Sequence, residues 1–158
     1  MGKRNQCIMS RVKLELKGFE ELVDKLHKYH DTPNKVGNKA LKEAAELMLK
    51  HEKTTLKSMH HGDRSTGKGA ANLKVGKLKT YPSGSKFVGV GFTKEMMGGG
   101  DNWNNIKGAY FNHYGYYNHR GGKYVAGSNW LGVAYENGAN PSYAIIKNTI
   151  IAELNSIG

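Results

Sequence analysis

Seven cationic side chains and no acidic ones lie between residues 64 and 94, so this stretch has the charge to attract polyanions. The cations are Arg64, Lys68, Lys74, Lys77, Lys79, Lys86 and Lys94. Lysines on the solvent face of a hairpin would give the same pattern without any binding function, and charge alone weights the two interpretations about equally. The first candidate site is therefore a basic surface for a polyanion or a protein partner.

An aromatic tract at residues 110–117, with the sequence YFNHYGYY, is the second candidate site. Tyrosines interleaved with Asn and His can stack on bases or form a protein interface. The alternative is a strand that packs on helices. We favour it for Phe111, whose ring we expect to point inward. The tyrosines suit a protein interface better. The candidate interface aromatics are Tyr110, Tyr114, Tyr116, Tyr117 and Trp130.

Patterns that would support catalysis or metal binding are incomplete. Residues 62–69 approach the phosphate-binding pattern G-x-x-x-x-G-K-[ST], but Gly69 replaces the hydroxyl that would hold Mg²⁺. The adjacent His60 and His61 would point apart, and His113 and His119 have no HExxH context. The pattern G-x-S-x-G does not occur in the sequence. We therefore expect neither an enzyme nor a metal or other cofactor.

The totals favour one basic domain. The chain has 158 residues and a formal net charge of +11, and its one cysteine, Cys7, fits a reducing compartment. No apolar run approaches the roughly 20 residues that cross a bilayer, so we expect no membrane contact. The basic start lacks the apolar core of a signal peptide, and Met9 is an alternative start. We expect a flexible tail at residues 1–11 and a single domain at residues 12–158.

The hydrophobic period changes near the N-terminus. Val12, Leu14 and Leu16 alternate with charged residues and predict a strand. After Gly18, the apolar residues at 19, 22, 23 and 26 have helical spacing. A second helix is predicted from Thr32-Pro33 towards Leu56, because Thr can cap and Pro suits the first helical position.

The remaining elements are shorter. Residues 73–75 and 88–92 alternate as a hairpin around the turn at 81–84, whose basic loop carries Lys77, Lys79 and Lys86. Residues 98–102 are predicted as a flexible Gly/Asn-rich loop, and 123–126 as a strand or bend. Ser128 or Asn129 would cap a short helix, and Asn140-Pro141 would begin a separate final helix. The predicted fold class is α+β, with two N-terminal helices and a C-terminal helix packed on an antiparallel sheet.

Several of these segments together resemble a known family. The opening VKLELKGFEELVDKL at residues 12–26 and NKALKEAAE at 38–46 are similar to the tail-component, or tail-completion, family of long-tailed bacteriophages and prophages. Arg64-Ser65-Thr66-Gly67 resembles the family's R-x-TG segment, and residues 111–115 resemble its aromatic-x-E-aromatic-G strand. Residues 129–131, with Ala134-Tyr135 and the last helix, resemble its closing region.

The chain departs from the family pattern at identifiable positions. His113 stands where the aromatic-Gly strand has an acid, and the closing proline is absent before Trp130. Residues 94–108 look like an insertion, and residues 135–138 are a second match to the aromatic-Gly pattern. The likeness nevertheless covers most of the chain from Val12 to Leu154.

The resemblance implies a structural virion protein at the head–tail junction, made in the host cytoplasm during assembly. It implies a homo-oligomeric ring, with a hexamer as one possible size, that joins other phage neck and tail proteins and lets DNA pass. The basic stretch would then line the channel, with weak and salt-screened DNA contacts, or dock on an acidic neighbour. The alternative function is a basic nucleic-acid-binding module.

Overall fold

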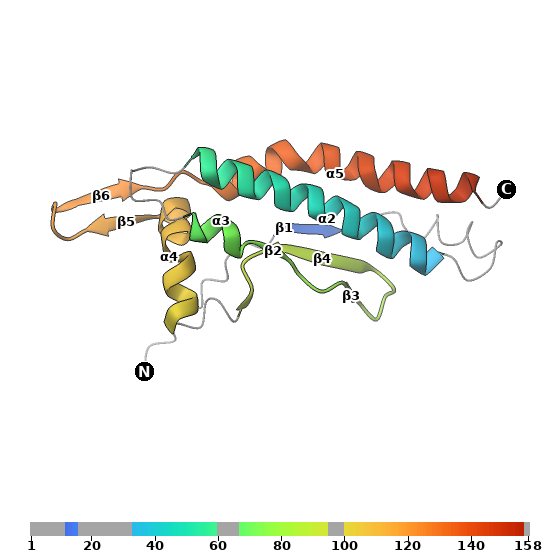
Figure 1. Ribbon diagram of the computed structural model, residues 1–158, viewed down its shortest axis with the longest axis horizontal. Coiled ribbons are helices and arrows are strands. Elements are labelled where there is room, and N and C mark those ends of the chain that lie inside the picture. Colours follow the sequence, from blue (N-terminus) through green and yellow to red (C-terminus); the bar gives the residue numbers. More distant parts are fainter. Residues whose placement is uncertain (1–11, 16–32, 60–66, 95–99, 157–158) are drawn as a thin grey trace.

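The computed structural model describes residues 12–15, 33–59, 67–94 and 100–156 of the chain (Figure 1). The predicted helix at residues 19–26 and the end of the first strand at Leu16 lie outside the described residues. Within the described residues the fold mixes helices with antiparallel sheets, so the broad α+β prediction is confirmed.

The central sheet is built around β4 (Lys86–Gly91). β1 (Val12–Glu15) pairs antiparallel with one side of it, and Val12 lies opposite Val90. β2 (Lys74–Val75) and the shorter β3 (Lys79–Thr80) also pair antiparallel with β4. The predicted hairpin is therefore confirmed, and the chain that pairs with β4 on this side is divided into two short strands, β2 and β3.

One long helix covers this sheet, and a second long helix packs on the first. α2 (Pro33–Ser58) begins at the predicted proline and contacts β4 and β2, while α5 (Trp130–Asn155) runs beside α2 (Figure 1). Small and apolar residues at helical spacing, including Ala40, Ala44 and Met48, are fully buried on α2. The C-terminal helix was expected on the sheet, but it packs mainly on α2. We call α2, α5 and the central sheet the body.

The last helix differs from its prediction. A short helix followed by a second one from Asn140-Pro141 was expected, but α5 is continuous and contains Pro141. Proline removes one helical hydrogen bond and costs stability, and here the apolar side chains of α5 offset that cost by packing. Ile146 and Ile150, which follow the proline, are buried. Asn129 stands at the N-cap with φ 50° and makes no side-chain capping bond.

The aromatic tract also differs from its prediction. The expected loop and strand are replaced by α4 (Gly100–Tyr114), which extends through most of the tract. Ile106 and Ala109, three residues apart, are buried on one side of this helix. The strand β5 (Gly115–Asn118) begins only at the glycine, which has φ +81°, and it pairs with β6 (Lys123–Ala126).

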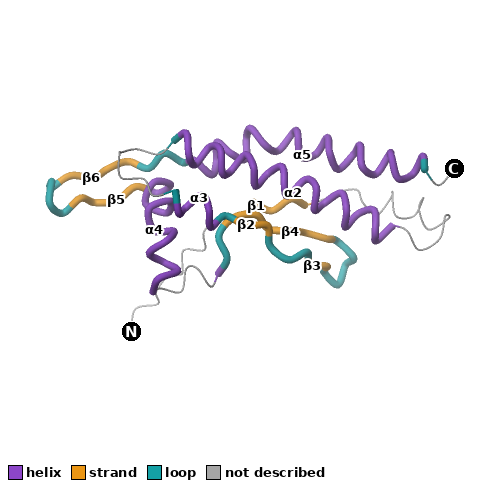
Figure 2. Tube along the Cα trace, viewed as in Figure 1, coloured by secondary structure: helices purple, strands orange, loops and turns teal. Residues whose placement is uncertain are grey.

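β5 and β6 form a separate two-stranded sheet that projects from one end of the molecule (Figure 2). We call residues 115–126 the arm. Its root is linked to the body through α4 and through α3 (Lys68–Asn72), a short helix that was not predicted and that contacts both α4 and α2.

Candidate binding surfaces

An open groove of about 610 Å³ runs along β2, β3 and β4. In β4, Val88 and Val90 are buried, so the residues that alternate with them belong to the opposite face of the sheet. One of these is Gly89, which adds no side chain to the floor. The groove walls include Lys74, Lys77, Lys79, Lys94, Tyr81 and Phe87.

The segment that follows β2 lies close to the groove floor at Gly76. The Gly76 amide donates a 2.7 Å hydrogen bond to the Gly89 carbonyl, and a Cβ on Gly76 would come within 3.0 Å of that oxygen. Tyr81 and Phe87 stack with ring centroids 4.7 Å apart. The groove therefore has a flat backbone floor and an aromatic wall.

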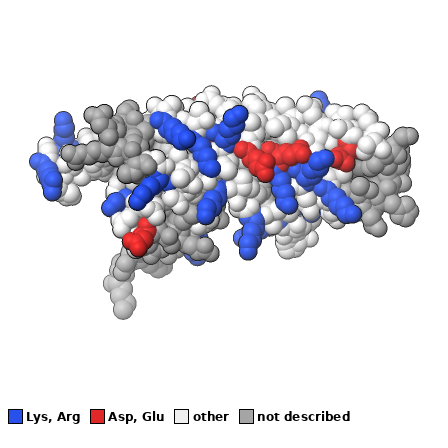
Figure 3. Space-filling model, in the orientation of Figure 1, with Lys and Arg blue, Asp and Glu red and all other residues white. Residues whose placement is uncertain are grey.

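The groove is electropositive. Its four lysines are all exposed, and in the described part of the chain none of them makes an ion pair with an acid. Figure 3 shows lysines and arginines spread over the visible face of the molecule, with few acidic groups between them. Exposed lysines around an acid-free groove can hold a polyanion through screened contacts.

The structure gathers only some of the predicted basic residues. Lys74, Lys77 and Lys79 line the groove together, and Lys94 joins them from the end of the basic stretch. Lys68 lies at the start of α3, and half-buried Lys86 lies opposite Thr80 in the sheet, so neither lines the groove. Arg64 lies outside the described residues.

The arm carries the second surface. Tyr116 and Tyr117 are 43% and 52% exposed, and Tyr124, which the sequence did not single out, is 60% exposed. Tyr110 and Tyr114 are half-buried beside the core and contact each other, with ring centroids 4.8 Å apart. Of the candidate tyrosines, those beyond Gly115 are the exposed ones.

Two aromatic predictions were wrong. Trp130, a candidate interface residue, is 0% exposed, and its indole nitrogen donates a 2.9 Å hydrogen bond to the Ala109 carbonyl. Trp130 therefore anchors α5 to α4 from inside the core. Phe111, expected to point inward, is 39% exposed, because a helix places it on the opposite side from Ile106.

Buried polar groups lie beneath these surfaces. Glu52 on α2 is fully buried, and neither carboxylate oxygen has a hydrogen-bond partner in the described structure. Burial raises the pKa of Glu52 to about 8, so the side chain is mostly protonated at neutral pH. A Cβ added to Gly91 would lie 4.0 Å from its Oε2 atom, so this carboxyl adjoins the backbone of the groove-lining strand.

His113 is the other buried titratable group near a candidate surface. Its ring packs edge-on against Tyr114 and Trp130, with centroids 4.4 and 6.0 Å away, and burial lowers its pKa. Among the described residues, its Nδ1 atom has no hydrogen-bond partner. His113 is thus a packing residue at the junction of α4 and α5.

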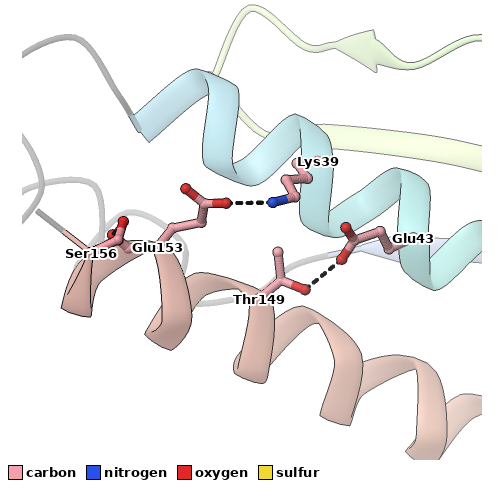
Figure 4. A network of polar contacts seen from close by, with 5 residues as sticks. All are labelled: Lys39, Glu43, Thr149, Glu153 and Ser156. Carbon is pink, nitrogen blue, oxygen red and sulfur yellow. Dashed lines mark hydrogen bonds and ion pairs between the residues drawn. The ribbon is translucent and has the colours of Figure 1, made fainter.

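Polar contacts also join the two long helices (Figure 4). Lys39 pairs with Glu153 at 2.5 Å, and the Thr149 hydroxyl donates a 2.6 Å hydrogen bond to Glu43. The hydrogen bond to Glu153, with its negative charge, raises the pKa of Lys39. These polar contacts join α2 and α5 along their shared face.

A search of the described residues for clusters of three or more metal-ligating side chains finds none. None of the described helices is long and apolar enough to cross a membrane. A scan against protein-family models finds no match to this chain, and searches of curated proteins and of solved structures find none either.

Proposed function

We propose that this chain is a structural protein of a bacteriophage or prophage virion, located at the head–tail junction. The sequence pattern carries the proposal: a predicted strand followed, after Gly18, by apolar residues at helical spacing, then an alanine-rich second helix and the segment at 64–67. The likeness of residues 111–115 to a family strand does not add to it, because Phe111 to Tyr114 lie in α4. Its copies would form a ring that joins the tail to the capsid connector and lets DNA pass. The protein would have no catalytic role.

The lysine groove and the tyrosines of the arm are both compatible with a protein of the head–tail junction. A junction protein must hold protein neighbours, and exposed tyrosines on a projecting arm are the type of residue enriched in protein interfaces. It must also tolerate passing DNA, and the lysine groove offers screened contacts without a tight pocket. These features support the proposal, while the sequence resemblance remains its basis.

The test is a phage or induced prophage in which the gene for this chain is deleted. DNA-filled heads and free, unjoined tails are expected in negative-stain images, and a copy of the gene supplied in trans should restore joined particles. Normal infectious particles from the deletion would exclude the neck role. In joined particles, an antibody to the chain should label the neck.

The groove supports a second candidate function, a nucleic-acid-binding module. Lys74, Lys77 and Lys79 are exposed and lie around one groove, so their replacement by Glu should abolish salt-sensitive DNA binding by the purified chain. The matched control changes three exposed lysines outside the groove to Glu: Lys57, Lys107 and Lys147. Both triple variants have the same net charge, so equal losses would indicate non-specific attraction alone.

A further inference from the structure

The arm is held rigidly at its root. The Ser128 amide donates a 2.7 Å hydrogen bond to the Asn112 carbonyl, and the Tyr124 hydroxyl donates a 2.8 Å bond to the Tyr114 carbonyl. Gly115 and Gly127 cross so closely that a Cβ on either would come within 2.7 Å of the other's amide nitrogen. The direction of the arm is therefore fixed by two hydrogen bonds, one of them from a tyrosine hydroxyl, and by the close approach of two glycines.

The tip of the arm is also ordered. The Asn118 side-chain oxygen accepts hydrogen bonds from the Arg120 and Gly121 amides, at 3.1 and 3.2 Å. Gly122 completes the turn with φ +62°. A ribbon that is ordered at both ends loses little conformational freedom when it binds, and this favours recognition.

One face of the arm has no covering in the described structure. Tyr117 lies directly opposite Tyr124 in the β5–β6 register, so both rings belong to the same face, and both are more than half exposed. A two-stranded ribbon is at best marginally stable when both faces meet water. These features indicate that the tyrosine pair contacts a partner.

The chemistry of the arm favours a protein over duplex DNA. Its cations, Arg120 and Lys123, lie at the tip, whereas firm DNA binding uses several phosphate contacts along the backbone. Tyr and Arg together are enriched in protein interfaces. No Asp or Glu occurs from residue 102 to residue 135, so the partner surface should offer an acid near apolar groups.

The outward face of α5 has this composition. Exposed residues at helical spacing form one continuous strip, which we call the α5 strip: Glu136, Asn140, Tyr143, Ala144, Lys147 and Ile151. Tyr143 and Ile151 are each 43% exposed. Glu136, the one acid of the strip, makes no ion pair within the described structure.

We propose that the arm of one copy docks on the α5 strip of a second copy, with Tyr117 and Tyr124 against Tyr143 and the cationic tip near Glu136. The inference rests on the proposed ring and names its subunit contact. Charge complementarity favours a second copy of this chain as the partner. The arm carries Arg120 and Lys123 and no acid, and the α5 strip offers Glu136 on a face whose one other charged residue is Lys147. Because the two surfaces are different, the contact is heterologous and can continue from copy to copy until a ring closes.

Site-specific cross-linking tests this contact. In a Cys7→Ser background, the His119→Cys protein is mixed at high concentration with the Asn140→Cys protein and treated with a short bismaleimide. A covalent dimer is expected in the mixture and not from either protein alone. One chain that carries both His119→Cys and Asn140→Cys should give a ladder of higher oligomers.

Two further variants test the chemistry of the contact. Tyr117→Ser should lower the dimer yield about tenfold, as expected for a central aromatic residue of an interface. Glu136→Lys should lower it as well, and Arg120→Glu on the arm partner should restore part of the yield. A cysteine at the exposed turn between β3 and β4, Ser83→Cys, is the matched control and should give no dimer with His119→Cys.

Several outcomes would overturn the inference: no cross-linking in the mixture, dimers from His119→Cys alone, or equal yield with Ser83→Cys. Loss of duplex-DNA binding in Tyr117→Ser, as large as in the groove variant, would make the arm a nucleic-acid surface instead. The gene deletion separates the two proposals. If the deletion gives unjoined tails but the cross-link does not form, the neck function stands and this contact is wrong. If the cross-link forms but the deletion gives normal particles, the contact stands and the neck function is wrong.

Discussion

In the body, α2 and α5 bury their apolar faces against each other, and Lys39–Glu153 and Thr149–Glu43 join them by polar contacts. In the arm, two strands are ordered mainly by backbone pairing, a close glycine contact and a few side-chain hydrogen bonds to the backbone, while the tyrosine rings stay exposed. The body buries most of its large apolar side chains, whereas the arm leaves its aromatic rings available. Substitutions in the body should therefore change the free energy of unfolding, and substitutions in the arm should leave it nearly unchanged.

The largest expected effect concerns Glu52, because its buried carboxyl is destabilised when it ionises. Its pKa is raised from 4.5 to about 8 in the folded state, so the native protein holds a proton that the unfolded chain releases. Stability from this group is fully present below pH 4.5 and is lost as the pH rises towards 8. At 1.36 kcal/mol per pKa unit, the full loss is about 5 kcal/mol.

Glu52→Gln should remove this dependence, which urea unfolding between pH 5 and pH 9 would measure. The quantity to compare is the slope of unfolding free energy against pH in the wild type and in the variant. The wild-type slope alone is not enough, because His113 makes stability rise with pH while Glu52 makes it fall. The pKa of His113 is lowered by burial, so its contribution to stability falls as the pH drops below its usual range. Parallel slopes for wild type and variant would show that Glu52 does not control the dependence.

The next effect comes from the seam between the long helices. Gly138 is buried on α5, and a Cβ there would lie 2.8 Å from Met48 Sδ and 3.3 Å from His51 Cβ. Gly138→Val should therefore lower the free energy of unfolding by about 2 kcal/mol through overpacking. Gly108 on α4 is exposed and has no atoms within 4 Å of a built Cβ, so Gly108→Val is the matched control and should be close to neutral.

A smaller effect is expected for the hydrogen bond between Thr149 on α5 and Glu43 on α2. Thr149→Val keeps the shape of the side chain but removes the hydrogen bond to the Glu43 carboxylate. The loss should be about 1 kcal/mol in chemical denaturation, in the usual range for one such bond. The exposed Thr54 on α2 serves as the reference, and an equal cost for Thr54→Val would mean that the bond itself contributes little.

The smallest effect on stability is predicted in the arm. Tyr117→Ser removes a ring that is more than half exposed, so the free energy of unfolding should change by less than about 0.5 kcal/mol. A thermal melt of the purified chain measures this. A loss comparable to that of Gly138→Val would show that the tyrosine supports the monomer, and the contrast between arm and body would disappear.

Helical spacing and turn chemistry predicted much of the body. The proline at position 33 and the spaced alanines located α2, and alternation located β4. The aromatic tract was misread because adjacent aromatic residues favour strands locally, whereas contacts of Ile106 and Ala109 with the core override that preference. The Asn140-Pro141 pair predicts a helix start, but the apolar spacing continues across Pro141 and α5 is continuous there.

The candidate surfaces were predicted in part. The charge of the basic stretch could be predicted from the sequence, but not which lysines lie together, because their positions depend on the pairing of β2 and β3 with β4. Glu52 was missed, although it lies four residues after Met48, on the same face of α2, and this spacing was a usable signal. Trp130 could not be assigned to the core without knowing that α4 packs against it.

The glycine crossing at the root of the arm has a consequence for symmetry. It sets one angle between the arm and the axis of α5, since neither Gly115 nor Gly127 has room to yield. In the proposed contact between the arm of one copy and α5 of the next, that angle would help to set the rotation between neighbouring copies. That rotation would determine how many copies complete a full turn, so two glycines would contribute to the diameter of the opening.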